Sequence, residues 1–217
     1  MREISELVTG YREFLTDTWP QQAALYRTLA NAGQAPSTMI VACCDSRADP
    51  ATIFNAKPGG LFVVRNVANL VPPFEPHGDF HGTSAALEFA VTDLNVEHIV
   101  VLGHARCGGI SAFLDELHTR SSEHSFIARW LSVLNGVRAE ALRAAGDGSD
   151  GKAEAAARQQ ALEHAGIRLS LENLTSFPFI RERLAAGQLS LHGAYFDIAT
   201  GALHARNPEN GAFEPVT

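Results

Sequence analysis

The sequence has few cysteines, no surplus of basic residues and no long apolar run. Its 217 residues include 3 cysteines, and Lys and Arg number 17 against 24 for Asp and Glu. The polar start, Met1 to Glu6, has no apolar signal core, and nowhere do about eighteen apolar residues follow one another. These absences argue against a disulfide-stabilised secreted protein, a membrane protein and a binder of phosphate backbones. We therefore expect a cytoplasmic protein with no nucleic-acid or membrane partner.

The bulk composition is that of an ordinary globular protein. Hydrophobic residues make up 46% of the chain, and the formal net charge is -7. A chain of this length can bury one substantial core. We expect a single domain over 1–217, with an N-terminal helical arm at 1–32, a core at 33–110 and a helical and C-terminal strand part at 111–217. The short Gly- and Asp-rich stretch at 146–151 reads as a loop between helices.

The spacing of apolar residues predicts alternating helices and strands. Helical spacing predicts an N-terminal amphipathic helix whose face carries Ile4, Leu7, Val8, Tyr11, Phe14 and Leu15. The other predicted helices cover 23–30, a stretch from a cap at Thr83 or Ser84 to Leu94, 126–137, 153–174 with a possible break at Gly166, and 178–187. Runs rich in β-branched residues predict strands at 38–43, 61–65, 98–103, 189–196 and 202–206, the last two joined at Thr200-Gly201. This alternation is typical of an α/β fold with right-handed crossovers.

Two short segments carry side chains that bind zinc: Cys43-Cys44-Asp45-Ser46-Arg47 and His104-Ala105-Arg106-Cys107-Gly108-Gly109. Alternate side chains of an extended strand share a face, so Cys43, Asp45 and Arg47 project together while Cys44 points away. Both segments follow predicted strands, and open α/β sheets bind ligands at the carboxyl ends of their strands.

A catalytic zinc ion takes three protein ligands and keeps a fourth position open. Cys43, His104 and Cys107 supply three donors, and Asp45 is either a displaceable fourth ligand or a neighbour of the metal. Two other interpretations stay open. Cysteines are often buried as apolar side chains, and a pair of cysteines can form a disulfide. The positions at strand ends beside glycines favour the metal site.

The ordered motifs resemble those of the β-class carbonic anhydrases, most closely the plant-type branch shared with many bacteria. The motifs are Cys-x-Asp-x-Arg, His-x-x-Cys-Gly-Gly and, between them, Arg65-Asn66-Val67-Ala68-Asn69-Leu70-Val71-Pro72-Pro73. The similarity extends from about Gln34 to Asp197. It implies a central, mostly parallel four-stranded sheet with an added C-terminal edge strand, flanked by helices. It also implies a homodimer, or a tetramer or larger assembly, in which the N-terminal helices pack on the partner.

The resemblance implies a zinc enzyme that reversibly hydrates carbon dioxide to bicarbonate and a proton, by attack of zinc-bound hydroxide. Cys43, His104 and Cys107 would hold the metal. Asp45 would accept a hydrogen bond from the hydroxide. Arg47 would hold Asp45 away from the metal, because a guanidinium matches a carboxylate with two parallel hydrogen bonds. A purely structural ion pair is the alternative for these two residues.

The substrate residues implied by the resemblance are Gln34, Phe62, Val67, Phe89 and Gly108. The amide of Gln34 can both donate to and accept from a bound oxygen, whereas its position after Gly33 alone reads as a solvated loop. The apolar residues would line a carbon dioxide pocket, and from the sequence alone they read as core. Phe89 stands where the family more usually has a tyrosine, so no hydroxyl acts there.

Many β-class members are switched by bicarbonate through a Trp, an Arg and a Tyr outside the zinc site. Here those positions hold Ile40, Arg65 and Phe196, so we expect the switch to be missing. Two rival functions remain open. One is hydrolysis of carbonyl sulfide or carbon disulfide on the same scaffold. The other is a noncatalytic zinc-binding or redox-sensing protein, whose zinc would need four permanent ligands.

Overall fold

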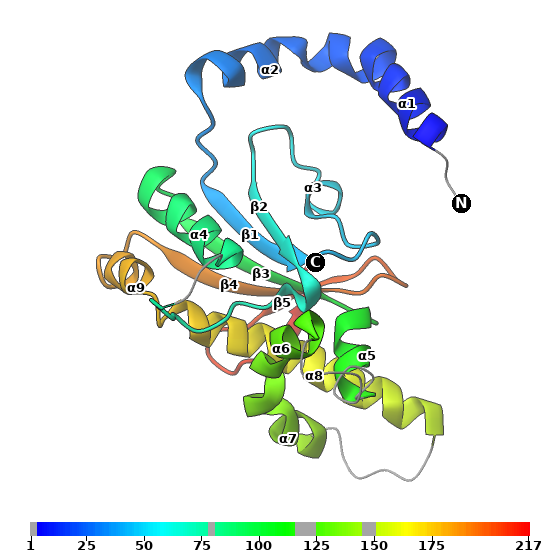
Figure 1. Cartoon of the computed structure of the whole chain (residues 1–217), viewed down its shortest axis with the longest axis vertical. Coiled ribbons are helices and arrows are strands. Elements are labelled where there is room, and N and C mark those ends of the chain that lie inside the picture. The colour runs from blue at the N-terminus through cyan, green and yellow to red at the C-terminus, as the bar shows by residue number, and fades with distance from the viewer. Residues whose placement is uncertain (1–3, 78–80, 116–124, 145–150) are drawn as a thin grey trace.

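The computed structural model describes residues 4–77, 81–115, 125–144 and 151–217, so most of the loop predicted at 146–151 lies outside the described residues. A six-stranded sheet forms its centre, in the order β2-β1-β3-β4-β5-β6 (Figure 1). The strands are β1 Thr38–Cys43, β2 Phe62–Asn66, β3 His98–His104, β4 Ser190–Phe196, β5 Leu203–Arg206 and β6 Phe213–Pro215. β2, β1, β3 and β4 are parallel, and β5 and β6 are antiparallel to their neighbours.

The parallel part of the sheet agrees with the sequence prediction, and the C-terminal part has one strand more than predicted. The turn between β4 and β5 lies at Thr200-Gly201, where Gly201 has φ 74° and its N–H donates to the Asp197 carbonyl at 2.8 Å. The strand that sequence analysis missed is β6, which pairs with β5. It has only three residues, one of them Pro215. A segment this short shows no recognisable alternation, and proline is confined to sheet edges.

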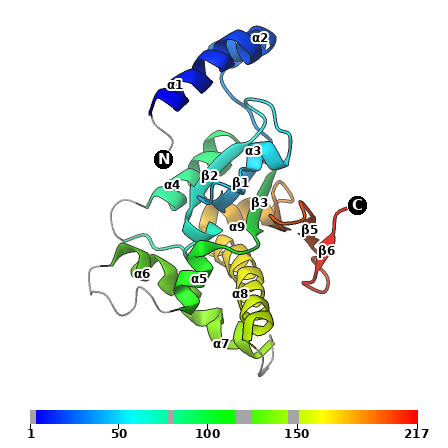
Figure 2. The same cartoon turned by 90° about the vertical axis from the view of Figure 1, so that its right-hand side faces the viewer.

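Helices cover one face of the sheet, and a long helix crosses the middle of that face (Figures 1 and 2). The helices that follow the N-terminal arm are α3 Pro50–Ile53, α4 Gly82–Glu88, α5 Gly108–Leu114, α6 Phe126–Leu131, α7 Asn135–Ala144, α8 Gly151–Leu174 and α9 Pro178–Ala185. α3 lies on the opposite face from α8, because its Ile53 packs with Ile40 and Ala42. α8 packs against β3 and β4. Ile167 of α8 lies against Gly103, where a Cβ atom would come within 2.6 Å of the Ile167 side chain. The glycine in β3 therefore allows close helix–sheet packing.

Several predicted helix details were wrong. Gly166 does not break α8; it is buried inside the continuous helix, facing Leu134. α4 begins at Gly82 after His81, with no side-chain cap, rather than at a cap from Thr83 or Ser84. The predicted helix at 126–137 is divided into α6, a 3-10 segment at Ser132–Leu134 and α7. α3 and α5 were not predicted, because helices of 4 and 7 residues carry too little periodicity.

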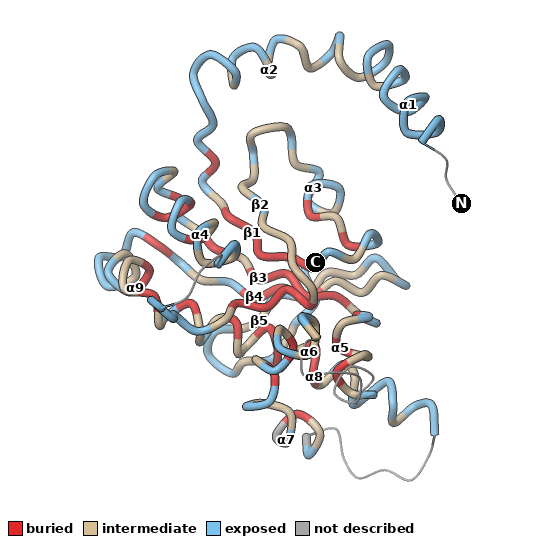
Figure 3. Tube along the Cα trace, in the orientation of Figure 1, coloured by how far each residue is buried: buried red, intermediate tan, exposed pale blue. Residues whose placement is uncertain are grey.

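Two apolar layers hold the sheet. On the helix-covered face, Met39, Val41, Ile99 and Val101 are fully buried and pack in one cluster with Ile167. On the opposite face, a smaller cluster contains Ile40, Ala42, Leu102 and Ala194. A third cluster joins α5, α6 and α8 beside the carboxyl ends of the strands. The burial pattern in Figure 3 places the buried segments along the central strands. This packing fixes the strand ends that carry the candidate site.

The N-terminal arm projects away from the sheet (Figures 1 to 3). It consists of α1 Ile4–Glu13, a π-helical segment Phe14–Thr18 and α2 Trp19–Ala32, so the predicted helix at 23–30 is part of a longer one. Neither α1 nor α2 contains a buried residue, and 75% of Ile4 and 62% of Leu7 are exposed. Within the described ranges, no helix is both long and apolar enough to cross a membrane.

Candidate metal centre

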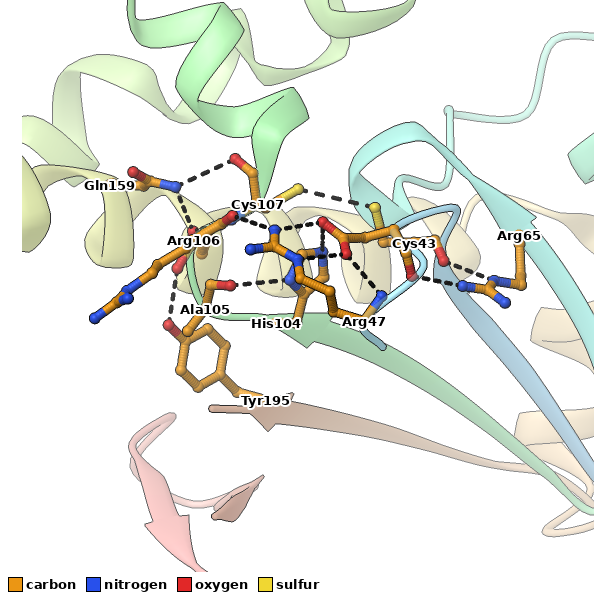
Figure 4. A network of polar contacts seen from close by, with 11 residues as sticks. Cys43, Arg47, Arg65, His104, Ala105, Arg106, Cys107, Gln159 and Tyr195 are labelled. Atoms are coloured by element: carbon orange, nitrogen blue, oxygen red, sulfur yellow. Dashed lines mark hydrogen bonds and ion pairs between the residues drawn. The ribbon is translucent and has the colours of Figure 1, made fainter. Parts of the chain in front are cut away.

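Three metal-binding side chains meet at the carboxyl end of the sheet. Cys43 is the last residue of β1, His104 is the last residue of β3, and Cys107 immediately precedes α5. β1 and β3 are adjacent and parallel, so their ends coincide. The ligand atoms of the three residues all lie within 4.8 Å of one another, and all three residues are buried. Figure 4 shows the two cysteine sulfurs facing each other beside His104.

The geometry of these donors fits zinc. Zn–S bonds of about 2.3 Å in a tetrahedral site place two sulfurs about 3.8 Å apart, and Cys43 Sγ lies 3.9 Å from Cys107 Sγ. His104 Nδ1 is 3.0 Å from the Ala105 carbonyl, which assigns its proton to Nδ1. His104 Nε2 is buried and has no hydrogen-bond partner among the described residues. A metal ion would satisfy this nitrogen, which is otherwise a costly unpaired buried atom.

Backbone amides surround the two sulfurs. The amides of Asp45 and Ala68 donate to the Cys43 sulfur, and those of Ile110 and Gly109 donate to the Cys107 sulfur. Contact with Cys107 lowers the pKa of Cys43, and the same contact raises the pKa of Cys107. These directions belong to two adjacent thiols that share a proton. Donors aimed at both sulfurs favour the thiolate form that binds zinc.

The peptide group between Val67 and Ala68 is held in an unusual conformation beside Cys43. Ala68 has φ 64° and Asn69 has φ 48°, a left-handed region that costs energy for residues other than glycine. The indole Nε1 of Trp130 donates to the Val67 carbonyl at 2.7 Å. That carbonyl and the Ala68 N–H belong to the same peptide group, so Trp130 holds the group that donates to the Cys43 sulfur.

Asp45 lies beside the metal-binding group and is held by Arg47. Arg47 Nε donates to Asp45 Oδ1 at 2.9 Å and Nη2 donates to Oδ2 at 2.7 Å, while the backbone N–H of Arg47 donates to Oδ1 at 3.0 Å. These hydrogen bonds from Arg47 keep the pKa of Asp45 well below its usual range. Asp45 Oδ2 lies 3.9 Å from His104 Nε2. The carboxylate therefore faces the metal-binding group with both oxygens engaged.

The predicted strand alternation does not extend through the first motif, because β1 ends at Cys43. A turn closed by the Ala48 N–H and the Asp45 carbonyl, 3.1 Å apart, places Asp45 and Arg47 instead. Cys44 is exposed, whereas Cys43 is buried. Arg47 Nη2 also donates to the Arg106 carbonyl at 3.1 Å, which links the two motif segments (Figure 4). Arg65 Nε donates to the Cys43 carbonyl at 2.8 Å, and its Nη2 donates to the Asp45 carbonyl at 2.7 Å. The first motif is thus fixed by side chains from its own segment and from β2.

The predicted substrate residues divide into two groups. Val67 and Gly108 lie at this centre, since Val67 adjoins the peptide beside Cys43 and Gly108 is the first residue of α5. Gln34, Phe62 and Phe89 lie elsewhere. Phe62 pairs with Met39, four residues before Cys43, which places it about 13 Å along the strands from the metal centre. Phe62 packs on Phe89 with ring centroids 5.8 Å apart.

Gln34 precedes β1 by several residues and is exposed. It therefore belongs, with the Phe62 and Phe89 pair, to the amino end of the sheet. The three positions of the bicarbonate switch are also accounted for. Ile40 and Phe196 pack in one apolar cluster, and Arg65 is engaged with backbone carbonyls and with Asp49 Oδ1 at 3.2 Å. The absence of a bicarbonate switch stays a prediction.

Sequence analysis missed a buried polar network behind Cys107. Glu163 of α8 is only 4% exposed. Its Oε1 accepts hydrogen bonds from the Cys107 N–H at 2.8 Å and from Gln159 Nε2 at 3.0 Å, and its Oε2 accepts one from the Tyr195 hydroxyl at 2.8 Å. Burial raises the pKa of Glu163. The available signal was its place on the buried face of the helix, where carboxylates are rare unless hydrogen-bonded.

Comparisons with known proteins show what this chain is similar to. A family model described as carbonic anhydrase matches residues 38–203. The chain is 43% identical over 172 residues to "Beta carbonic anhydrase 5, chloroplastic" of Arabidopsis thaliana, an alignment that covers 79% of this chain and 54% of that protein. The chain thus spans about half the length of this relative.

Solved structures agree with the fold over nearly the whole chain. The β-carbonic anhydrase CcaA has a TM-score of 0.88 and 28% identity, with 98% of this chain and 99% of that chain covered. One of two tetrameric β-carbonic anhydrases from Sordaria macrospora has a TM-score of 0.79 and 29% identity, with 97% and 98% covered.

Proposed function

The chain belongs to the β-carbonic anhydrase family, and from this premise we propose that it catalyses the reversible hydration of carbon dioxide to bicarbonate and a proton, with zinc as its cofactor. One observation carries the proposal beyond family membership. A group of three zinc donors lies beside a carboxylate whose two oxygens are both held by Arg47. A structural zinc site would instead be closed by four permanent ligands.

The proposed division of roles follows from this geometry. Cys43, His104 and Cys107 would hold the zinc ion, which when bound would supply Lewis acidity that lowers the pKa of water towards neutrality. Asp45 accepts a hydrogen bond beside the metal and orients the attacking oxygen. Arg47 keeps Asp45 off the metal, since the bidentate contact would have to break before a carboxylate oxygen could ligate zinc.

We also propose a homodimer or larger assembly, in which the N-terminal arm packs on the partner. The arm supports this because its apolar residues Ile4, Leu7 and Tyr11 are exposed at 75%, 62% and 59%. Gln34, Phe62 and Phe89 lie too far from the metal centre of their own chain to touch its substrate. In the assembly they would approach the partner's centre, while Val67 and Gly108 would line the apolar slot of their own. Sedimentation analysis should show no monomer; a fully active monomer would contradict this proposal.

The domain and location proposals rest on the same features. We propose one domain over 1–217, comprising the arm at 1–32, the zinc-site core at 33–110 and the part at 111–217. A cytoplasmic location is supported by the cysteines, because all three are free. Free thiols are typical of reducing compartments, where they stay available to metal.

Side-by-side assays test the proposed reaction. Purified, zinc-loaded protein is assayed for carbon dioxide hydration and for hydrolysis of carbonyl sulfide and carbon disulfide. We expect carbon dioxide to react fastest. Faster hydrolysis of a sulfur substrate would favour the rival hydrolase. No turnover of any of the three by fully loaded protein would favour a noncatalytic zinc protein.

A further inference from the structure

Two side chains of α8 form hydrogen bonds with the backbone of one metal ligand, Cys107. The N–H of Cys107 donates to Glu163 Oε1 at 2.8 Å, and the carbonyl of Cys107 accepts from Gln159 Nε2 at 3.2 Å. Gln159 Nε2 also donates to Glu163 Oε1 at 3.0 Å. Gln159 and Glu163 are one helical turn apart, so they lie on the same face of α8. Both polar groups of a single residue are thus held by one rigid element.

The Glu163 carboxylate is itself held in place by three hydrogen bonds. Its partners are the Cys107 N–H, the Gln159 amide and the Tyr195 hydroxyl, and Tyr195 is only 3% exposed. Because an ionised carboxylate only accepts hydrogen bonds, three donors suit its charged form. Hydrogen bonds to an ionised acceptor are roughly twice as strong as neutral ones. The fixed carboxylate ties α8 and the end of β4 to Cys107.

Cys107 lies where the backbone needs such support. The preceding residue, Arg106, has φ 56°, a left-handed conformation that is costly for arginine. Cys107 immediately precedes α5, and its sulfur must lie near Cys43 for both to reach one metal ion. A small relaxation of the strained turn would move the sulfur away from the other donors.

We propose that Glu163 and Gln159 are positioning residues of the metal centre, which clamp the Cys107 backbone and thereby set how tightly the site holds zinc. The inference rests on the proposed zinc site. Neither side chain touches the substrate, and both act through Cys107. Outer residues of this kind usually change metal affinity by about 10–100-fold when they are substituted.

The test compares zinc release among four full-length variants. Glu163→Leu removes the acceptor, and Glu163→Gln keeps an acceptor oxygen without the charge. Gln159→Leu removes the donor at the Cys107 carbonyl. Glu172→Leu is the matched control, because Glu172 is an exposed glutamate of the same helix. Zinc transfer to a chromogenic chelator is measured well below the unfolding temperature. The thiolate-to-cobalt absorption band of the cobalt-substituted proteins reports the metal–sulfur geometry independently of activity.

We expect Glu163→Leu to release zinc fastest, at a rate at least about 10-fold above that of wild type. The zinc-release rate of Glu163→Gln should lie between those of Glu163→Leu and wild type, because an amide oxygen can still accept a hydrogen bond from the Cys107 N–H. Gln159→Leu should release zinc faster than wild type, and Glu172→Leu should not. The cobalt band should shift in Glu163→Leu and stay unchanged in the control. A merely structural role would lower the unfolding temperature of the zinc-free protein without changing zinc release.

The proposal would be overturned if Glu163→Leu released zinc at the wild-type rate. It would also be overturned if Glu163→Leu and Glu163→Gln released zinc at equal rates. If Glu163→Leu does not fold, Gln159→Leu decides alone, because this residue is only half-buried. Release from Gln159→Leu at the wild-type rate would then overturn the proposal. Zinc-loaded wild type without carbon dioxide hydration would refute the proposed function while leaving this test intact. Wild type that binds no zinc would refute both.

Discussion

Two adjacent glycines at the start of α5 offer a matched pair of substitutions. A Cβ atom added at Gly109 would lie 2.7 Å from Val67 Cγ1 and 3.2 Å from Ala68 Cβ, whereas a Cβ atom at Gly108 would meet nothing within 4 Å. Val67 is β-branched and stiff at χ1, and its carbonyl is held by Trp130. Gly109→Ala must therefore push on the peptide that donates to the Cys43 sulfur.

The size of the effect follows from the comparison. Alanine gains up to about 1 kcal/mol of helix propensity over glycine at either position, so this gain cancels between the two variants. Overpacking a tight contact costs about 1–3 kcal/mol, and only Gly109→Ala incurs it. For a chain of this size, each 1 kcal/mol changes the unfolding temperature by about 2–4 °C. Gly109→Ala should therefore unfold about 2–12 °C below Gly108→Ala.

Differential scanning calorimetry of both zinc-loaded variants, with zinc analysis of each, measures this difference. Gly109→Ala should also lose zinc more readily, because the displaced peptide holds Cys43. Gly108→Ala should keep its zinc and unfold no lower than wild type, up to about 4 °C above it. The carbon dioxide hydration rate of Gly108→Ala should nevertheless fall, because Gly108 is proposed to line the carbon dioxide pocket. Equal unfolding temperatures and zinc contents in the two variants would refute the packing argument.

Three further predictions concern the metal, the carboxylate and pH. Cys43→Ser should lose zinc and activity while Cys44→Ser keeps both, as metal analysis would show; equal zinc loss would contradict the choice of thiol. Arg47→Lys loses the bidentate contact, so hydration should fall and a crystal structure should show Asp45 on the metal; unchanged activity with Asp45 in place would contradict the restraint. Because its pKa is depressed, Asp45 stays ionised and paired with Arg47 even below the ordinary aspartate pKa, and the contact is lost only as the pH falls through the lower folded-state pKa. Hydration measured from about pH 6.5 to 9 should therefore rise with one simple titration of the activated water. Added bicarbonate should cause no cooperative inhibition, and a steep profile shifted by bicarbonate would contradict the missing switch.

The parallel sheet and the metal donors could be predicted because their signals are local and periodic. The strand predicted at 38–43 and the strand predicted at 98–103 are apolar runs; the first ends at Cys43, and His104 directly follows the second. Parallel pairing of β1 with β3 then brings Cys43 and His104 together without further information. The alternation of side chains also separates buried Cys43 from exposed Cys44.

The features that escaped prediction depend on tertiary contacts. Glu163 is a carboxylate in a helical pattern, and its role depends on Cys107 and Tyr195, which lie far from it in the sequence. Gly166 reads as a helix break, yet it is buried within the continuous α8, where a Cβ atom would make only ordinary contacts with Leu134 at 3.4 Å and Leu70 at 3.8 Å. The resemblance implies that Gln34 and Phe62 contact the substrate, but the strand direction places them at the other end of the sheet from the metal centre of their own chain.

The most direct test of the account measures carbon dioxide hydration against zinc content. The protein is stripped with a chelator, titrated with zinc, and assayed by stopped flow at each step. Hydration should be lost with the metal, return in proportion to added zinc and reach a plateau at about one zinc per chain, since the three donors hold a single ion. His104→Ala should show neither tight zinc binding nor recovery. Hydration that persists without zinc, or fully loaded protein that does not hydrate carbon dioxide, would contradict the account.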